Sequence, residues 1–248
     1  MMIQIARTFM LENIRNYGVG FGNSLPAFLF LLISFAMKFV VNEETFLYIV
    51  KGQFLPISIL LLIFSFAFSS VTIYLADMKA NRTFDWLKRT NVSSSTYYIG
   101  IGIGIFVLVN CMLISLLICY KLFIMISWGN VFSIVLISNF VLLALYPLSF
   151  ILAGVFKNGK VAQSMLVPIM ILFMFSVTMT TMFLTLAGKE PQQYFIFLIW
   201  NPMLYLNDSL QYYLGLTTMT WLPTYQYFVI LIVWSLALVL IARKVYHR

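Results

Sequence analysis

The chain has 248 residues, of which 62% are hydrophobic and 9% are charged, and it carries a formal net charge of +8. Soluble domains contain roughly 25% charged residues, so this composition excludes an ordinary soluble enzyme and a soluble nucleic-acid-binding domain. It predicts an all-α integral membrane protein in which residues 1–248 form a single transmembrane domain. The only His is His247, and Cys111 and Cys119 lie within one apolar run, so we expect neither a metal site nor a disulfide framework.

The first 17 residues have the pattern of an amphipathic helix. Apolar side chains recur at steps of three or four, and polar side chains gather on the opposite face. A short helix of this kind lies flat on the inner membrane surface, so residues 1–17 are predicted to form an interfacial helix. A frayed tail without a role is the alternative. The apolar positions are Ile3, Ala6, Met10, Ile14 and Tyr17.

Six apolar runs are predicted to be transmembrane helices. Each supplies about 20 residues, which at about 1.5 Å per residue cross a hydrocarbon core of about 30 Å. No charged residue lies deep within them, which argues against an ion-coupled carrier and favours a hydrophobic or amphipathic cargo. The runs are Phe21–Val41, Phe54–Leu75, Tyr97–Cys119, Val131–Phe156, Val161–Leu184 and Thr224–Ala242.

The basic residues are divided unequally between the two sides of this topology. The side that holds both termini has eleven of the fifteen Lys and Arg residues and three of the seven acids, and the other side has four of each. A basic excess in short loops marks the cytoplasmic side of a membrane, so both termini are predicted to be cytoplasmic. The net charge therefore reports topology, and no nucleic-acid partner is expected.

Residues 77–96, between the second and third spans, form the longest cytoplasmic connection and contain a short helical pattern. Phe84 and Leu87 share one helical face. We expect a coupling helix that presents these side chains and Trp86 to a cytoplasmic partner, because large apolar side chains need a surface against which to bury. A solvated loop or contact with lipid is the alternative. The predicted partner-coupling residues are Phe84, Asp85, Trp86, Leu87, Lys88 and Arg89.

Hydroxyl side chains form a stripe on the second span and another on the fifth. The spacings of seven, four and three residues, and of three and four, place each set on one helical face. Hydroxyls in hydrocarbon prefer a partner or water, so such a stripe faces protein or a cavity. Helix packing with bonds to the helix's own carbonyls explains them equally well. The residues are Ser58, Ser65, Ser69 and Thr72, and Thr178, Thr181 and Thr185.

Residues 188–222, between the fifth and sixth spans, are too apolar for an ordinary exposed loop. Two short helices, Tyr194–Trp200 and Met203–Leu214, are predicted to dip into the outer leaflet as a re-entrant segment buried by protein. A seventh span is the competing interpretation, but it would place the basic C terminus outside and break the charge rule.

Two segments resemble ABC-2-type transporter permeases. In LADMKANRTFDWLKRTNVSSSTYYIG, at Leu75–Gly100, a Thr, a Leu flanked by basic residues and an Asn-Val-Ser turn stand where the family has similar residues, with Asn91 in place of the usual Pro. WNPMLYLNDSLQYYL, at Trp200–Leu214, is similar to the family's Asn-Pro segment before the last span, with Gln211 where an Arg is common. The outer motif residues are Asn201, Pro202 and Tyr205.

The resemblance implies the permease subunit of an ATP-driven exporter in a bacterial cell membrane. Such a subunit dimerises with a second copy or a paralogue and binds separate ABC ATPase subunits, which hold ATP and Mg²⁺. The hydroxyl stripes would then line the cargo pathway, and peptides, antimicrobials or lipid-like molecules are the expected cargo. This chain is expected to be no enzyme. Gly154–Lys160 fits G-x-x-x-x-G-K, but Val161 follows it and no strand precedes it.

Two other classes of function remain open from the sequence. A non-transporting membrane sensor or immunity protein could use the same scaffold, and it would differ in lacking ATPase binding or transport. An intramembrane enzyme would need a catalytic base within the bilayer, and no His, Asp or Glu lies deep within the expected spans.

Overall fold

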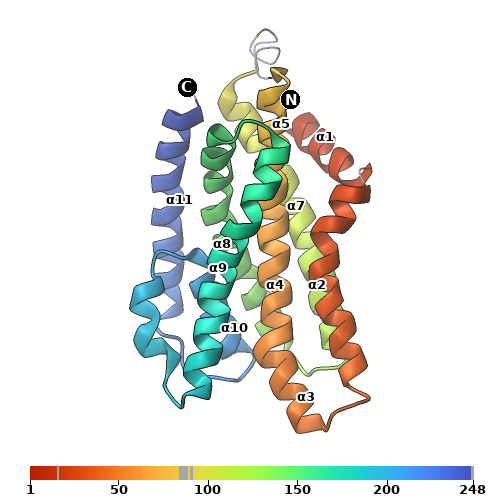
Figure 1. Cartoon of the computed structure of the whole chain (residues 1–248), viewed down its shortest axis with the longest axis vertical. Coiled ribbons are helices and arrows are strands. Elements are labelled where there is room, and N and C mark those ends of the chain that lie inside the picture. The colour runs from red at the N-terminus through yellow and green to blue at the C-terminus, as the bar shows by residue number, and fades with distance from the viewer. Residues whose placement is uncertain (16, 84–88, 90–91, 247–248) are drawn as a thin grey trace.

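The computed structural model describes residues 1–15, 17–83, 89 and 92–246, and the regular elements in that part of the chain are all helices. Figure 1 shows an elongated bundle in which the long helices run along its length and both chain termini lie at one end. The prediction of an all-α fold is confirmed. We call the end that holds both termini the terminal end, and the other the distal end.

The helices follow one another along the bundle with short connections. Within the described residues they are α1 (Met2–Arg15), α2 (Tyr17–Met37), α3 (Glu43–Ile49), η1 (Val50–Phe54), α4 (Leu55–Ile63), η2 (Phe64–Ser70), α5 (Val71–Ala80), α7 (Ser94–Lys121), α8 (Trp128–Val155), α9 (Gly159–Leu186), η3 (Pro191–Leu198), α10 (Pro202–Tyr213) and α11 (Thr224–Tyr246). Of these, η1 and η2 are π-helical and η3 is a 3₁₀ helix.

Five helices in the described part of the chain are long and apolar enough to cross a membrane. They are Glu43–Ala80, Ser95–Lys121, Trp128–Val155, Gly159–Leu186 and Thr224–Val245. This architecture is that of a multi-pass membrane protein by length and composition, and it confirms long apolar helices at five of the six expected spans. The other one corresponds to α2, whose apolar part, Gly22–Met37, is shorter. A crossing there stays a prediction.

The helix from Glu43 to Ala80 is the central column of the bundle (Figure 1) and is longer than expected. Its 38 residues would span about 57 Å, whereas the sequence predicted a span only from Phe54 to Leu75. The early start follows from a local cap, since the Asn42 side chain accepts the Thr45 N–H at 2.9 Å. Its apolar stretch is 83% buried, against 17% for those of α9 and α11, so the other helices are arranged around it.

Helix α1 packs against α7 where two glycines remove the side chains. A Cβ on Gly100 would lie 2.8 Å from Ile5 Cβ, and one on Gly104 would lie 3.0 Å from the Ala6 carbonyl oxygen. The two helices therefore approach more closely than any larger residue would allow. The face of α1 that packs inward consists of Ala6, Phe9 and Asn13. It is only partly the expected apolar stripe, of which Ile3 and Ile14 stay exposed.

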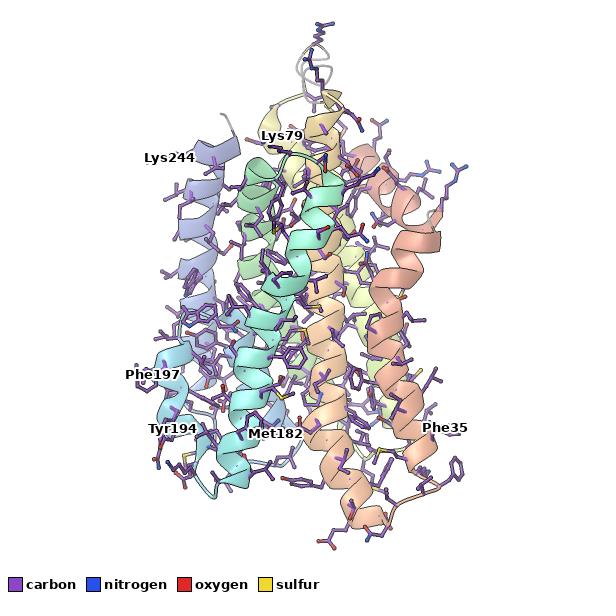
Figure 2. The ribbon with its side chains drawn as sticks, in the orientation of Figure 1. Phe35, Lys79, Met182, Tyr194, Phe197 and Lys244 are labelled. Carbon is purple, nitrogen blue, oxygen red and sulfur yellow. The ribbon has the colours of Figure 1, made fainter. Side chains whose placement is uncertain are left out.

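Basic residues of several helices gather at the terminal end within the described part of the chain. Lys79 and Lys244 lie there in Figure 2, whereas Phe35, Tyr194 and Phe197 lie toward the distal end. The ends of α5 and α11 and the turn between α8 and α9 meet at the terminal end (Figure 1), and they supply Lys79, Arg82, Lys157, Lys160, Arg243 and Lys244. This distribution agrees with the sequence-based assignment of charge to the side that holds both termini.

Candidate functional site

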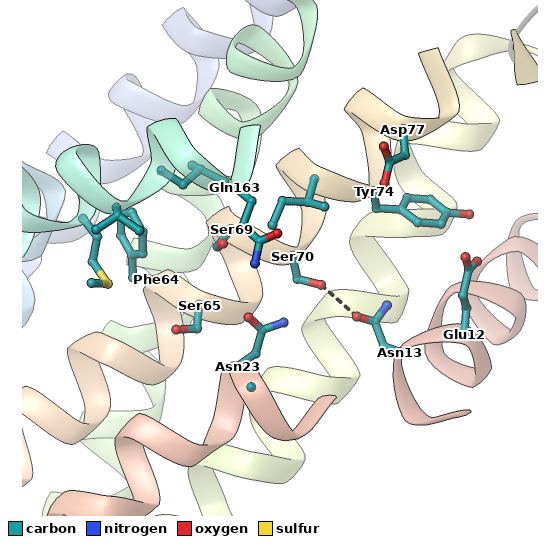
Figure 3. Close-up of a pocket in the computed structure, with 15 residues that line it drawn as sticks. Glu12, Asn13, Asn23, Phe64, Ser65, Ser69, Ser70, Tyr74, Asp77 and Gln163 are labelled. Carbon is teal, nitrogen blue, oxygen red and sulfur yellow. Dashed lines mark hydrogen bonds between the residues drawn. The ribbon is translucent and has the colours of Figure 1, made fainter. Parts of the chain in front are cut away.

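A cavity of about 390 Å³ lies between α1, α2, η2, α5 and α9 (Figure 3). Its volume lies within the roughly 300–1,000 Å³ of small-molecule sites. One part of its wall is polar and the other is apolar. The polar side chains are Glu12, Asn13, Asn23, Ser65, Ser69, Ser70, Tyr74, Asp77 and Gln163, and the apolar ones include Phe64, Ile73, Leu166, Val167 and Met170.

A buried hydrogen-bond chain fixes the wall between α1 and η2. The Ser70 hydroxyl donates to Asn13 Oδ1 at 2.8 Å, and the Asn13 amide donates to the Phe9 carbonyl oxygen at 2.9 Å. Both side chains are at most 6% exposed. Because buried polar groups are costly without partners, the Ser70–Asn13 bond holds α1 in register with η2, and the bond to Phe9 fixes the Asn13 side chain on α1.

Of the hydroxyl stripe predicted on the second span, some residues line the cavity and the others form hydrogen bonds elsewhere. Ser65 and Ser69 line the cavity. Ser58 instead lies within hydrogen-bond distance of the Tyr120 hydroxyl, with 2.9 Å between the two oxygens. The Thr72 hydroxyl donates to the Phe68 carbonyl oxygen of its own helix at 2.6 Å. The predicted pathway residues of this span are thus brought together at the cavity only in part.

The hydroxyls of the fifth expected span bond to their own helix. Thr178, Thr181 and Thr185 of α9 donate to carbonyl oxygens four residues earlier, at 3.0, 2.8 and 2.9 Å. Only Thr178 is buried. These residues do not line the cavity, and a role in a pathway between two copies of the chain stays a prediction.

Two residues at the end of α5 contact the turn between α8 and α9. The Gly159 N–H, in the first turn of α9, donates to the Asp77 carboxylate at 2.8 Å, and the Lys79 ammonium donates to the Gly154 carbonyl oxygen at the end of α8. The segment Gly154–Lys160 is therefore a helix–helix turn with no strand before it. Its glycines serve close packing, since a Cβ on Gly159 would lie 2.4 Å from an Asp77 carboxylate oxygen.

We expect Gly159→Ala to destabilise the protein by about 1–2 kcal/mol, because the new methyl group displaces the Asp77 carboxylate and breaks its hydrogen bond to the Gly159 N–H. The measurement is the thermal unfolding midpoint of the detergent-purified protein. Gly22→Ala is the matched control, because a Cβ at Gly22 meets nothing within 4 Å. Equal midpoints for the two variants would contradict this role of Gly159.

The predicted coupling segment lies mostly outside the described residues. Phe84, Asp85, Trp86, Leu87 and Lys88 are not among them, and Arg89 is exposed. The flanking helices are described, and α5 ends and α7 begins at the terminal end (Figure 1). The connection that holds the predicted coupling residues therefore starts and finishes at that end.

The Asn-Pro motif caps α10 and ties it to α9. Asn201 Oδ1 accepts the Met203 N–H at 2.9 Å, and the Asn201 amide donates to the Phe173 carbonyl oxygen at 2.6 Å. Pro202 occupies the first turn of α10, where its missing N–H costs nothing. The fully buried Tyr205 donates its hydroxyl to the Ile199 carbonyl oxygen at 2.9 Å. The motif thus has a structural role at this helix start.

The sequence analysis did not single out Asp208, which is only 2% exposed. Its carboxylate accepts hydrogen bonds from the Tyr227 hydroxyl at 2.6 Å, the Trp221 N–H at 2.9 Å and the Gln192 amide at 3.1 Å. Burial raises the pKa of Asp208, and these three donors lower it. The carboxylate thereby joins α10 to η3, to the segment before α11, and to α11 itself.

We expect the thermal unfolding midpoint of the wild-type protein, minus that of the Asp208→Asn variant, to increase as the pH is lowered from about 7 to about 4. Because the pKa of Asp208 is raised by burial, the folded protein holds this proton more tightly than the unfolded chain. The stability from this proton is complete below the unfolded pKa and lost as the pH rises through the folded one. Glu12, whose pKa burial also raises, is common to both proteins. Parallel midpoint-versus-pH curves would contradict the prediction.

Comparison with known proteins does not assign the chain to a family. No protein-family model matches the chain, and no curated protein matches it.

Proposed function

We propose that the chain is the permease subunit of a bacterial ABC-2-type exporter. In this proposal α2 supplies the sixth crossing, both termini are cytoplasmic, and two copies or paralogues assemble with two separate ATPase subunits. The cargo is hydrophobic or amphipathic and moves outward from the cytoplasm or the inner leaflet.

The observation that carries the proposal is the order of elements along the chain. An amphipathic α1 precedes the apolar helices, and α5 ends and α7 begins at the terminal end, where basic residues of α5, α11 and the α8–α9 turn also lie. The short helices η3 and α10 stand between α9 and α11 toward the distal end. This is the order that the resemblance of Leu75–Gly100 and Trp200–Leu214 to ABC-2 permeases implies.

The contacts of Asp77 and Lys79 supply a physical route for coupling. Both residues lie just before the connection that is proposed to bind the ATPase, and both bond to the turn between α8 and α9. A rigid-body movement of that connection would therefore pull on α5, α8 and α9 together. Two walls of the cavity, those from α5 and α9, would move with it.

The proposal is tested by ATP hydrolysis in lipid nanodiscs. We expect the complex purified from its native membrane to hydrolyse ATP, and the permease alone to show none. A chain that retains no ATPase would favour the sensor or immunity function.

A further inference from the structure

The cavity carries negative charge in a protein whose net charge is positive. Its charged lining residues are the two acids Glu12 and Asp77, and no Lys or Arg of the described residues lines it. Figure 3 shows Glu12 on α1 and Asp77 on α5 on the same side of the cavity, with the Tyr74 ring between the two elements. The nearby Lys79 side chain is occupied elsewhere, because it donates to the Gly154 carbonyl oxygen. A cation that enters this cavity therefore meets two carboxylates and no Lys or Arg of the described residues, although Asp77 also accepts the Gly159 N–H.

Two further observations point to a ligand in this cavity. Ser65 is 8% exposed and lines the cavity, and its hydroxyl makes no hydrogen bond to another residue within the described part of the chain. A hydroxyl that lines a cavity without a protein partner is available to hydrogen-bond a ligand or water there. Glu12 is only partly desolvated at the edge, yet burial raises its pKa and no neighbouring cation lowers it. Both groups are arranged to gain from a bound polar cation.

The wall contributed by η2 has an uncommon backbone. Phe64, Ser65, Ser69 and Ser70 all line the cavity, and all belong to the seven-residue π-helical stretch Phe64–Ser70. Long π-helical stretches are rare and occur mostly at functional sites, because the wider turn costs stability and re-aims side chains. Here the wider turn presents three hydroxyl groups and one aromatic ring to a single space.

We propose that this cavity binds an organic cation that has an ammonium head and an apolar body. The head would lie between Glu12, Asp77 and the Tyr74 ring, where carboxylates and an aromatic face both attract a positive charge. The body would lie against Phe64, Leu166 and Met170, and Ser65 would hydrogen-bond any polar atom between the two parts. That this cation is cargo rests on the proposed function, whereas the binding site itself does not.

The test is the binding of benzyltrimethylammonium to the permease purified alone in dodecyl maltoside, which contains no ammonium group, measured by isothermal titration calorimetry. We expect saturable binding with one site per chain, and a loss of affinity of about tenfold or more in Glu12→Gln, because the variant removes the coulombic attraction between the carboxylate and the quaternary ammonium. Benzyl alcohol, which lacks the charge, should not compete. Because no ATPase is present, a failure of this experiment is independent of a failure of the proposed function.

Two controls make the outcome decisive. Glu43→Gln changes an acid at the start of α3, away from the cavity, and should bind as the wild type does. Glu12 is exposed, so Glu12→Gln should keep the wild-type elution profile and thermal midpoint. Displacement of the probe by short-chain phosphatidylethanolamine would identify a lipid headgroup as the natural ammonium, and its absence would identify a free organic cation. No saturable binding, equal competition by benzyl alcohol, or unchanged affinity in Glu12→Gln would overturn the proposal.

Discussion

Replacing Trp86 and Leu87 together with Ala is expected to release the proposed ATPase subunit from the chain. Two large apolar side chains at the centre of an interface together contribute at least about 2 kcal/mol, so the double variant should bind the proposed ATPase at least about thirtyfold more weakly. The measurement is the amount of ATPase that co-purifies with a tagged permease in mild detergent. ATP-driven transport should fall in parallel, since the permease would no longer follow the ATPase.

The matched control for this experiment is an exposed aromatic residue at the distal end. Phe197 in η3 is 74% exposed, and Figure 2 places it toward the end away from both termini. Phe197→Ala should leave ATPase retention unchanged. Normal retention in the Trp86 and Leu87 variant, with an unchanged elution profile, would show that the segment is not the coupling surface.

Asp208→Ala is expected to destabilise the protein by about 3 kcal/mol or more, the largest stability effect that we predict. The substitution leaves the Tyr227 hydroxyl and the Trp221 N–H without their carboxylate acceptor, and each such loss costs about 1–3 kcal/mol. The Gln192 amide loses one of its two acceptors and keeps the Met219 carbonyl oxygen at 2.9 Å. The measurement is the temperature at which half of the detergent-purified protein remains monodisperse. The contacts that hold α10 against α11 should fail first.

Two control variants show whether the effect of Asp208→Ala comes from its buried hydrogen bonds or from the loss of a negative charge at the distal end. They are Tyr227→Phe and Glu190→Ala. Tyr227→Phe removes one of the three donors and should cost about 1 kcal/mol. Glu190 is exposed next to η3, so Glu190→Ala should cost little. If Asp208→Ala were as stable as Glu190→Ala, the carboxylate would have no structural role.

The sequence predicted the long helices well because hydropathy reports burial in an apolar medium. The predicted ends of the helices differ from the observed ends where polar residues lie within a helix. Lys51 and Gly52 lie in η1, so the apolar run starts after them, although the helix begins at Glu43 under the cap from Asn42. The two short helices before α11 were predicted close to η3 and α10, because Pro191 and Pro202 mark their first turns.

The cavity could be predicted only in part, because its wall comes from three stretches that are distant in the sequence, namely α1 with α2, η2 with α5, and α9. The spacing of Ser65 and Ser69 indicated a polar face, but nothing local relates it to Glu12 on α1. The same holds for Asp208, which the sequence places in a loop between spans. Its donors lie 13 to 19 residues away along the chain, and only the fold brings them to the carboxylate.

Native mass spectrometry of the complex extracted gently from its own membrane would decide whether this chain is the membrane subunit of an ATP-driven exporter. We expect an assembly with two permease chains, or one and a paralogue, and two copies of an ATP-binding cassette subunit. A permease that is extracted intact as a monomer or dimer, with no ATPase at any detergent concentration that preserves its fold, would contradict this function.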